Sequence, residues 1–172
     1  GAPAIICGVN PENGKFFVGT KSVFNKTPKI NYTTSDIRKN HDGEVAKKLQ
    51  VCLANLSRLN IKGILQGDLL FTDDLKAINI DGEKMISFTP NTITYAVPVN
   101  SDIGKRIARA KMGIVFHTSY SGKTMDKLSA SFGTVRGSGN RNVFLASAGY
   151  KETAVMFSKS ELSRFDAQIR MA

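Results

Sequence analysis

Residues 62–72, KGILQGDLLFT, form an apolar run with a single carboxylate in its middle. The run predicts a strand, whose alternation sends Gln66, Asp68 and Leu70 to one face. The other face then carries the core residues Leu65, Leu69 and Phe71. Because a buried carboxylate without a partner is strongly disfavoured, we expect Asp68 to lie on a central strand and to open into a cleft. Two alternatives stay open: an Asp turned to solvent on an edge strand, and one paired with a lysine of the same sheet.

The length and composition are those of a single globular domain: 172 residues, 41% hydrophobic and 22% charged. No apolar run approaches the roughly 20 residues that span a bilayer, and no segment has the composition of a signal peptide. We therefore expect a cytoplasmic protein with no membrane partner. Lys and Arg number 24 against 14 Asp and Glu, which leaves a net charge of +10. This charge fits a polyanionic partner such as nucleic acid, and equally a scattered basic surface.

The two cysteines and two histidines do not suggest a metal site. Cys7 and Cys52 lie in the apolar segments AIICGV and LQVCLANL, which predicts small buried side chains in a reducing compartment rather than a disulfide. The sequence has no CxxC or HExxH motif, and neither His41 nor His117 has metal-binding side chains at the usual spacing. We therefore predict no metal-binding residues.

The pattern along the chain predicts an α+β fold. Two strands flank the turn NPENG at 10–14, and apolar residues at three- and four-residue steps predict a helix over 43–59. Another helix is predicted to begin after Ser101 and to end before Gly113. Further strands are predicted at 62–72, 84–89, 92–99, 113–118, 143–149 and 153–157, and further helices near 35–39, 123–132 and 159–170. The segments 73–83 and 134–142 are predicted as connections. Interspersed helices and an early hairpin are typical of α+β proteins.

Several familiar motifs are excluded. The sequence SGKT at 121–124 ends like a phosphate-binding P-loop, but the position that must be glycine is His117, so we interpret it as a turn before a helix. Two histidines in unrelated contexts do not support a hydrolase triad. The aromatic residues are not interleaved with basic ones along the chain, as they would be on a platform that stacks single strands.

The order of the predicted elements resembles the nucleotidyltransferase superfamily of ATP-dependent DNA and RNA ligases and mRNA capping enzymes. The matching features are a hairpin that begins with GAP, a basic residue in GTKS, a long helix, the strand LQGDLLF, the strand TITYAVPV, a helix, and a strand that leads to YSG. The resemblance covers residues 1–132 and is closest to RNA-ligase-like proteins of tailed phages. It implies a nucleotidyltransferase (ATP-grasp-like) domain with antiparallel sheets, packed helices and a nucleotide cleft between them.

Four residues resemble nucleotide-binding positions of this family. Gly1 resembles the glycine that closes the signature Lys-x-Asp-Gly, whose lysine carries the AMP. Lys21 resembles the basic residue that holds phosphate or the polynucleotide end. Asp68 resembles the acid, usually Glu, that approaches the ribose, and the resemblance implies that Gly67 admits the sugar. Tyr95 resembles the aromatic that stacks on adenine, although AVP replaces the usual Phe-Asp after it. The alternatives are an ordinary exposed lysine and a half-buried tyrosine of the sheet.

The resemblance implies part of a polynucleotide ligase-like enzyme that forms a lysyl-AMP intermediate and uses ATP and Mg²⁺ on DNA or RNA. The signature lysine would lie before Gly1, so we expect residues 1–172 to be a single partial domain without a catalytic residue. The competing hypothesis is a non-catalytic phage protein that keeps the ligase-like fold as a nucleic-acid-binding or virion-associated module. If phage-encoded, either would act in the host-cell cytoplasm.

Overall fold

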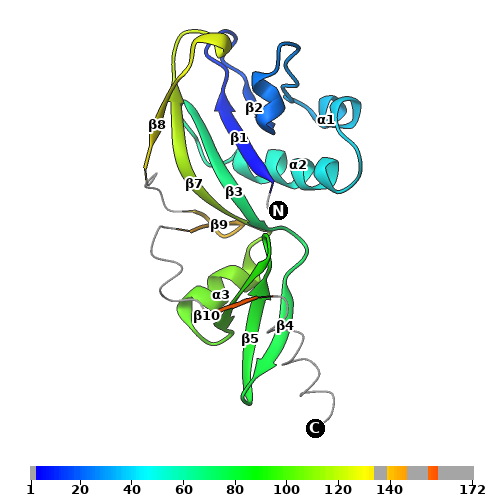
Figure 1. Ribbon diagram of the computed structural model, residues 1–172, viewed down its shortest axis with the longest axis vertical. Helices are drawn as coiled ribbons and strands as arrows, with labels where there is room; N and C mark the ends of the chain where they lie inside the picture. Colours follow the sequence, from blue (N-terminus) through cyan, green and yellow to red (C-terminus); the bar gives the residue numbers. More distant parts are fainter. Residues whose placement is uncertain (1–2, 134–138, 147–154, 159–172) are drawn as a thin grey trace.

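Two β-sheets follow one another along the long axis of the molecule (Figure 1). The computed structural model describes residues 3–133, 139–146 and 155–158. The six-stranded sheet has the order β2-β1-β3-β7-β8, with β9 also paired to β7, and the four-stranded sheet has the order β10-β6-β5-β4. The strands of the first are β1 (Ala4–Val9), β2 (Phe16–Gly19), β3 (Ile64–Phe71), β7 (Met112–Ser121), β8 (Ser129–Phe132) and β9 (Val143–Leu145). Those of the second are β4 (Lys76–Ile80), β5 (Glu83–Phe88), β6 (Ile93–Pro98) and β10 (Val155–Ser158). Apart from the parallel pair β7–β9, the described strands pair antiparallel, and the fold is α+β as predicted.

The helices begin where the sequence offers a cap or an amphipathic repeat. They are α1 (Thr34–Asn40), α2 (Gly43–Leu56) and α3 (Asp102–Arg109), with the short 3₁₀ turns η1 (Lys21–Phe24) and η2 (Met125–Lys127). The Ser101 hydroxyl accepts a hydrogen bond from the Gly104 amide at 3.0 Å and so caps α3 as expected. The helix α2 ends at Leu56 and not at residue 59, because the next amides bond three residues back, Arg58 to Asn55 and Leu59 to Leu56.

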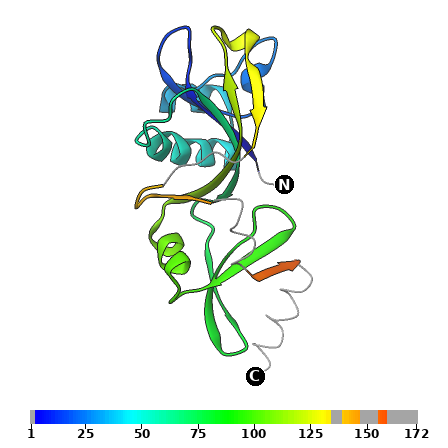
Figure 2. The same cartoon turned by 90° about the vertical axis from the view of Figure 1, so that its left-hand side faces the viewer.

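Two large hydrophobic cores follow from this arrangement. In the first, α2 packs across one face of the six-stranded sheet (Figure 2), and Cys7 and Cys52 are both fully buried there. Burial raises the pKa of the Cys52 thiol to about 12 and also raises that of Cys7. The second core joins the two sheets. It contains Leu70, Phe71, Phe88, Tyr95, Val97, Ile107, Phe144 and Ala146.

The strand β3 departs from simple alternation at its end. Leu69 pairs with Ile114 and Phe71 with Gly113 of β7, so Leu70 is an extra residue in the ladder. The predicted division of faces therefore holds up to Leu69, which packs in the first core. After it, Phe71 is buried as predicted, but Leu70, predicted on the cleft side, is buried as well. Leu70 and Phe71 both enter the second core between the sheets. The ring of Phe71 occupies space that a side chain at Gly113 would need, 2.3 Å from its Cβ position.

Other corrections concern the connections. The predicted connection 73–83 contains β4, and the helix predicted over 123–132 is a single 3₁₀ turn followed by β8. In both segments pairing with a neighbouring strand decides the conformation, which local sequence does not report. The predicted helix at 159–170 lies outside the described residues, as does part of the connection 134–142. No helix in the described part of the chain is long and apolar enough to cross a membrane.

Candidate functional site

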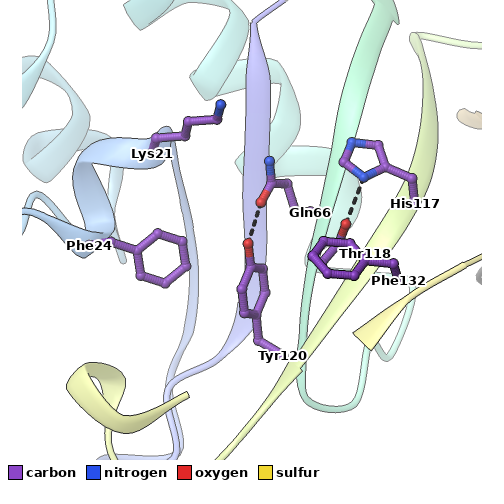
Figure 3. Close-up of a pocket in the computed structure, with 7 residues that line it drawn as sticks. All are labelled: Lys21, Phe24, Gln66, His117, Thr118, Tyr120 and Phe132. Atoms are coloured by element: carbon purple, nitrogen blue, oxygen red, sulfur yellow. Dashed lines mark hydrogen bonds between the residues drawn. The ribbon is translucent and has the colours of Figure 1, made fainter. Parts of the chain in front are cut away.

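A cavity of about 450 Å³ opens on the face of the six-stranded sheet opposite α2 (Figure 3). The lining side chains come from η1, β3, β7 and β8: Lys21, Phe24, Gln66, His117, Thr118, Tyr120 and Phe132. Figure 3 shows Lys21 and Phe24 on one side, His117 and Phe132 on the other, and Gln66 and Tyr120 between them. Four segments that are distant in sequence therefore build one site.

A β-bulge on β7 brings two consecutive side chains to this cavity. Gln66 pairs with Thr118 and Gly67 with Phe116, so His117 is an extra residue between them. In a regular strand, neighbouring side chains point to opposite faces. Here the bulge turns both His117 and Thr118 toward the cavity, while Phe116 stays in the first core.

The bulge also explains Gly67. A Cβ at this position would lie 2.3 Å from the Val115 carbonyl oxygen and 2.9 Å from the Phe116 ring. The glycine therefore admits the backbone of β7, and the implied role of admitting a sugar is corrected.

Asp68 lies on a central strand, between β1 and β7. Its side chain is 51% exposed, and Oδ1 is 3.5 Å from Nε2 of His117. Among the described residues the ionisable side chain within 4 Å of this carboxylate is thus His117 and not a lysine of the sheet. His117 lines the cavity and Asp68 does not, so Asp68 lies just outside the lining, next to His117, at a position we call the rim.

His117 is held at both ring nitrogens. Nδ1 is 2.7 Å from the Thr118 hydroxyl, and Nε2 faces Asp68. Thr118 itself is only 2% exposed, so it orients the ring and offers little surface to a ligand. The result is an imidazole fixed between a carboxylate and a hydroxyl, with 43% of its side chain exposed.

The opposite wall combines a cation with aromatic rings. Val23 anchors η1 in a small core with Ile6 and Phe17, which leaves the neighbouring Lys21 exposed at the cavity. Phe24, 40% exposed, packs against Tyr120 with ring centroids 5.1 Å apart. Across the cavity Phe132 is 84% exposed.

Gln66 and Tyr120 form the floor. The Tyr120 hydroxyl donates to Oε1 of Gln66 at 2.5 Å. Because this bond uses the amide oxygen, the amide nitrogen of Gln66 is the group that remains to donate to a ligand. The prediction that Gln66 shares a face with Asp68 agrees with the backbone register, in which Ile6 and Ala4 of β1 lie opposite them.

The four predicted nucleotide-binding residues do not all lie at the cavity. Lys21 and Asp68 lie on the same face, at the wall and rim of one cavity. Tyr95 lies in β6 of the other sheet, is 3% exposed and stacks on Phe88 with centroids 5.5 Å apart. The resemblance assigns Tyr95 and Asp68 to the same nucleotide, but the structure buries Tyr95 in the core between the sheets. Gly1 falls outside the described residues.

Sequence reasoning missed much of the cavity. Phe24, Tyr120 and Phe132 come from three separate elements, so their meeting beside Lys21 leaves no pattern of alternating basic and aromatic residues. One available signal was the polar run HTSY at 117–120, which interrupts an otherwise apolar strand.

The described side chains around the cavity do not form a metal site by themselves. Within the described residues no group of three His, Cys, Asp or Glu side chains could hold a metal. Mg²⁺ usually takes one or two carboxylates and completes its shell with water and substrate phosphates. Asp68 at the rim is a single carboxylate and would need such additional ligands to hold Mg²⁺.

Comparison with known proteins gives one match. No match was found among curated proteins or among solved structures. A family of unknown function, DUF6267, matches residues 1–172, and the chain belongs to this family.

Proposed function

We propose that the cavity binds a nucleotide, and that the chain is the nucleotide-binding part of a polynucleotide ligase-like nucleotidyltransferase. The observation that carries the proposal is the meeting of Lys21, the His117–Asp68 pair and exposed aromatic rings around one cavity. Such an enzyme would pass AMP from ATP, through a lysine, to the 5′-phosphate of DNA or RNA, with Mg²⁺ neutralising the phosphate charge.

The chemistry of each wall fits one part of a nucleotide. The volume of about 450 Å³ lies within the usual range for small-molecule sites. Phe24 and Phe132 present exposed ring faces on which a base can stack, and Lys21 is an ammonium donor for phosphate. Asp68 and the amide nitrogen of Gln66 are a hydrogen-bond acceptor and a donor for ribose hydroxyls.

The entry of the chain into the sheet also supports the proposal. Ala4, the first residue of β1, pairs with Asp68, and the Leu69 amide donates to the Pro3 carbonyl at 3.3 Å. The first described residues of the chain thus lie beside Asp68, which is compatible with a signature lysine upstream of Gly1.

Nucleotide binding is tested by calorimetric titration of the chain with ATP and Mg²⁺. We expect Lys21→Met and His117→Ala each to weaken binding about tenfold or more, because each removes one hydrogen-bonding side chain from the cavity lining. Lys15→Met is the matched control, because Lys15 is exposed in the β1–β2 turn outside the cavity lining. Equal affinity of all four proteins, or no binding at all, would reject the nucleotide pocket.

Nucleotidyl transfer has a separate test. The proposal predicts a lysine three residues before Gly1 and an aspartate directly before it in the complete gene. A protein that includes those residues should form an acid-labile adenylate with labelled ATP, whereas the chain from Gly1 should not, because it lacks the signature lysine. Label on the shorter chain would contradict this assignment of the nucleophile.

A non-catalytic nucleic-acid-binding module is the second candidate. The net charge of +10 supports it, as does the scarcity of ion pairs: in the described residues two lysines lie within 4 Å of a carboxylate, Lys47 and Lys48. A gene that encodes no Lys-x-Asp before Gly1 would favour this candidate over the ligase-like enzyme.

A further inference from the structure

Basic side chains gather on and around α3, away from the cavity. Lys105, Arg106 and Arg109 are exposed on this helix, and Lys111 follows it. The Lys111 amide donates to the Asn142 carbonyl at 2.8 Å, which brings the exposed Arg141 next to the same end of the helix. We call these five residues the α3 basic patch. The helix α3 packs against β5 and β6 of the four-stranded sheet (Figure 1), whereas the cavity lining comes from η1 and three strands of the six-stranded sheet.

The patch is not neutralised from within the described part of the chain. None of its five residues forms an ion pair there. Lys105 and Arg109 are four residues apart on one helix, and like charges at this spacing destabilise a helix. Basic residues in a last turn do offset the helix dipole. That explanation covers Arg106 and Arg109, but neither Lys111 nor Arg141, which lie outside the helix.

One contact gives the patch a defined shape. The Arg106 guanidinium lies over the Phe144 ring of β9, 5.3 Å from its centroid. This cation–π contact ties α3 to the strand that follows Arg141. The patch is therefore supported by two elements that are fixed to each other.

The buried side of α3 argues against a membrane surface. Helices that lie on membranes insert an exposed apolar face among the lipids. In α3 the apolar residue Ile107 is 1% exposed and packs in the core between the sheets. What α3 offers to a partner is thus charge, with no large apolar side chain beside it.

We infer that the α3 basic patch binds the sugar-phosphate backbone of a polynucleotide, at a surface separate from the nucleotide cavity. Spaced cations on a rigid surface match the regular charges of such a backbone. The inference rests on the proposed function only for the identity of the polyanion. It adds a second surface that would hold the nucleic acid while the cavity holds the nucleotide.

The test compares two triple variants of equal charge in the whole chain. One is Lys105→Gln with Arg109→Gln and Lys111→Gln; Arg106 is kept because of its contact with Phe144. The control is Lys15→Gln with Lys47→Gln and Arg58→Gln, all exposed on the other sheet's side. Binding to a fluorescein-labelled oligonucleotide, single-stranded and duplex, is measured by anisotropy over a range of salt. Thermal unfolding checks that both variants fold.

We expect the patch variant to lose about tenfold or more in affinity and the slope of log K against log salt to become smaller by about two to three, one phosphate contact per cation. The control should keep most of both. Both the control and the patch variant should bind ATP as tightly as the unchanged chain does. This result would separate the proposed backbone-binding surface from the proposed nucleotide cavity. Equal losses in both variants, or no oligonucleotide binding at about 50 mM salt, would overturn the inference. So would tighter, patch-dependent binding to phosphatidylserine vesicles.

Discussion

Each of the two sheets contains a residue that the family resemblance assigns to the nucleotide, but the two residues differ in their exposure and contacts. In the six-stranded sheet Asp68 is half-exposed beside His117 at a cavity. In the four-stranded sheet Tyr95 is buried and stacks on Phe88. The first sheet has one face covered by α2 and leaves part of the other to polar side chains. The second directs its aromatic residues into the core that joins the sheets.

This difference shows which kind of side chain marks a site. An aromatic ring can pack in a hydrophobic core or stack on a ligand, so its residue type alone does not show which of the two it does. A carboxylate within an apolar strand is disfavoured in a core, so it marks a face that is not packed. The inference from Asp68 therefore placed a cavity near the right strand, whereas the inference from Tyr95 selected a core residue.

The largest effect is expected at Tyr95. Replacing it with alanine removes a buried ring from the core between the sheets and should lower the free energy of unfolding by about 3 to 5 kcal/mol. Ile93→Ala on the same strand is the control, because Ile93 is 38% exposed and should lose much less. Urea unfolding measures both. A stable Tyr95→Ala protein with weakened ATP binding would return Tyr95 to the site.

A smaller loss is expected at Gly67. Alanine there places a methyl group 2.3 Å from the Val115 carbonyl, so β7 must shift, at about 1 to 3 kcal/mol. Because the shift would move the bulge, the affinity for ATP should fall as well. The Tyr95→Ala protein, measured under conditions in which it is folded, should keep its affinity for ATP. Urea unfolding and calorimetry are the measurements. Unchanged stability would show that β7 does not approach Gly67 so closely.

Asp68 should behave in the opposite way to Tyr95. Its side chain is half-exposed and packs little, so Asp68→Ala should change the free energy of unfolding by no more than about 0.5 kcal/mol. ATP binding should nevertheless weaken, because a rim carboxylate and the partner of His117 are lost. Glu83→Ala removes an exposed carboxylate from the four-stranded sheet and should leave binding intact. Equal binding by both variants would remove Asp68 from the site.

The smallest effect is a pH dependence of the free energy of unfolding. It comes from the part of the chain that contains the six-stranded sheet and both histidines, His41 and His117. Burial, aided by the charge of Lys29 and opposed by Asp42, lowers the pKa of His41 from its ordinary 6.5. The unfolded chain then takes up this proton first, so stability should fall as the pH drops below about 6.5. In His41→Gln the fall should be shallower over roughly pH 5 to 8. Thermal unfolding across this interval would contradict the assignment if both proteins lost stability equally.

The His41 ring also faces a buried amide, that of Asn31. Asn31, fully buried, donates through Nδ2 to the Val18 carbonyl and lies 3.2 Å from Nε2 of His41. Its Oδ1 accepts from Asn40, which fixes the orientation of the amide. Nε2 of His41 must therefore accept a hydrogen bond from the Asn31 amide. In a protonated ring, Nε2–H would also be a donor, and two donors would face each other.

Local patterns predicted most of the framework. The turn at 10–14, the repeat in α2 and the cap at Ser101 are each specified by residues close together in sequence, and the structure contains all three elements. The strands β4 and β8 were missed because they are short, largely exposed and depend on a neighbour for their pairing.

The site was less predictable for a related reason. Each of the two bulges between β3 and β7 arises from the match of two strands, and neither strand alone shows it. One bulge moves His117 into the cavity, and the other sends Phe71 from the expected core to the second one. Asp68 could be singled out from its own residue type, and Lys21 only from the family resemblance. His117, Tyr120 and Phe132 acquire a role only from their neighbours in space.

The position of β1 has a consequence for how the protein folds. This strand comes first in the chain but lies inside the sheet, with β2 on one side and β3 on the other. Its pairing with β2 is a local hairpin, whereas its pairing with β3 joins Ala4 to Asp68 across two helices. Contacts so far apart in sequence form slowly. Until β3 has been synthesised, the hairpin of β1 and β2 has one unpaired edge, which leaves it open to pairing with another chain.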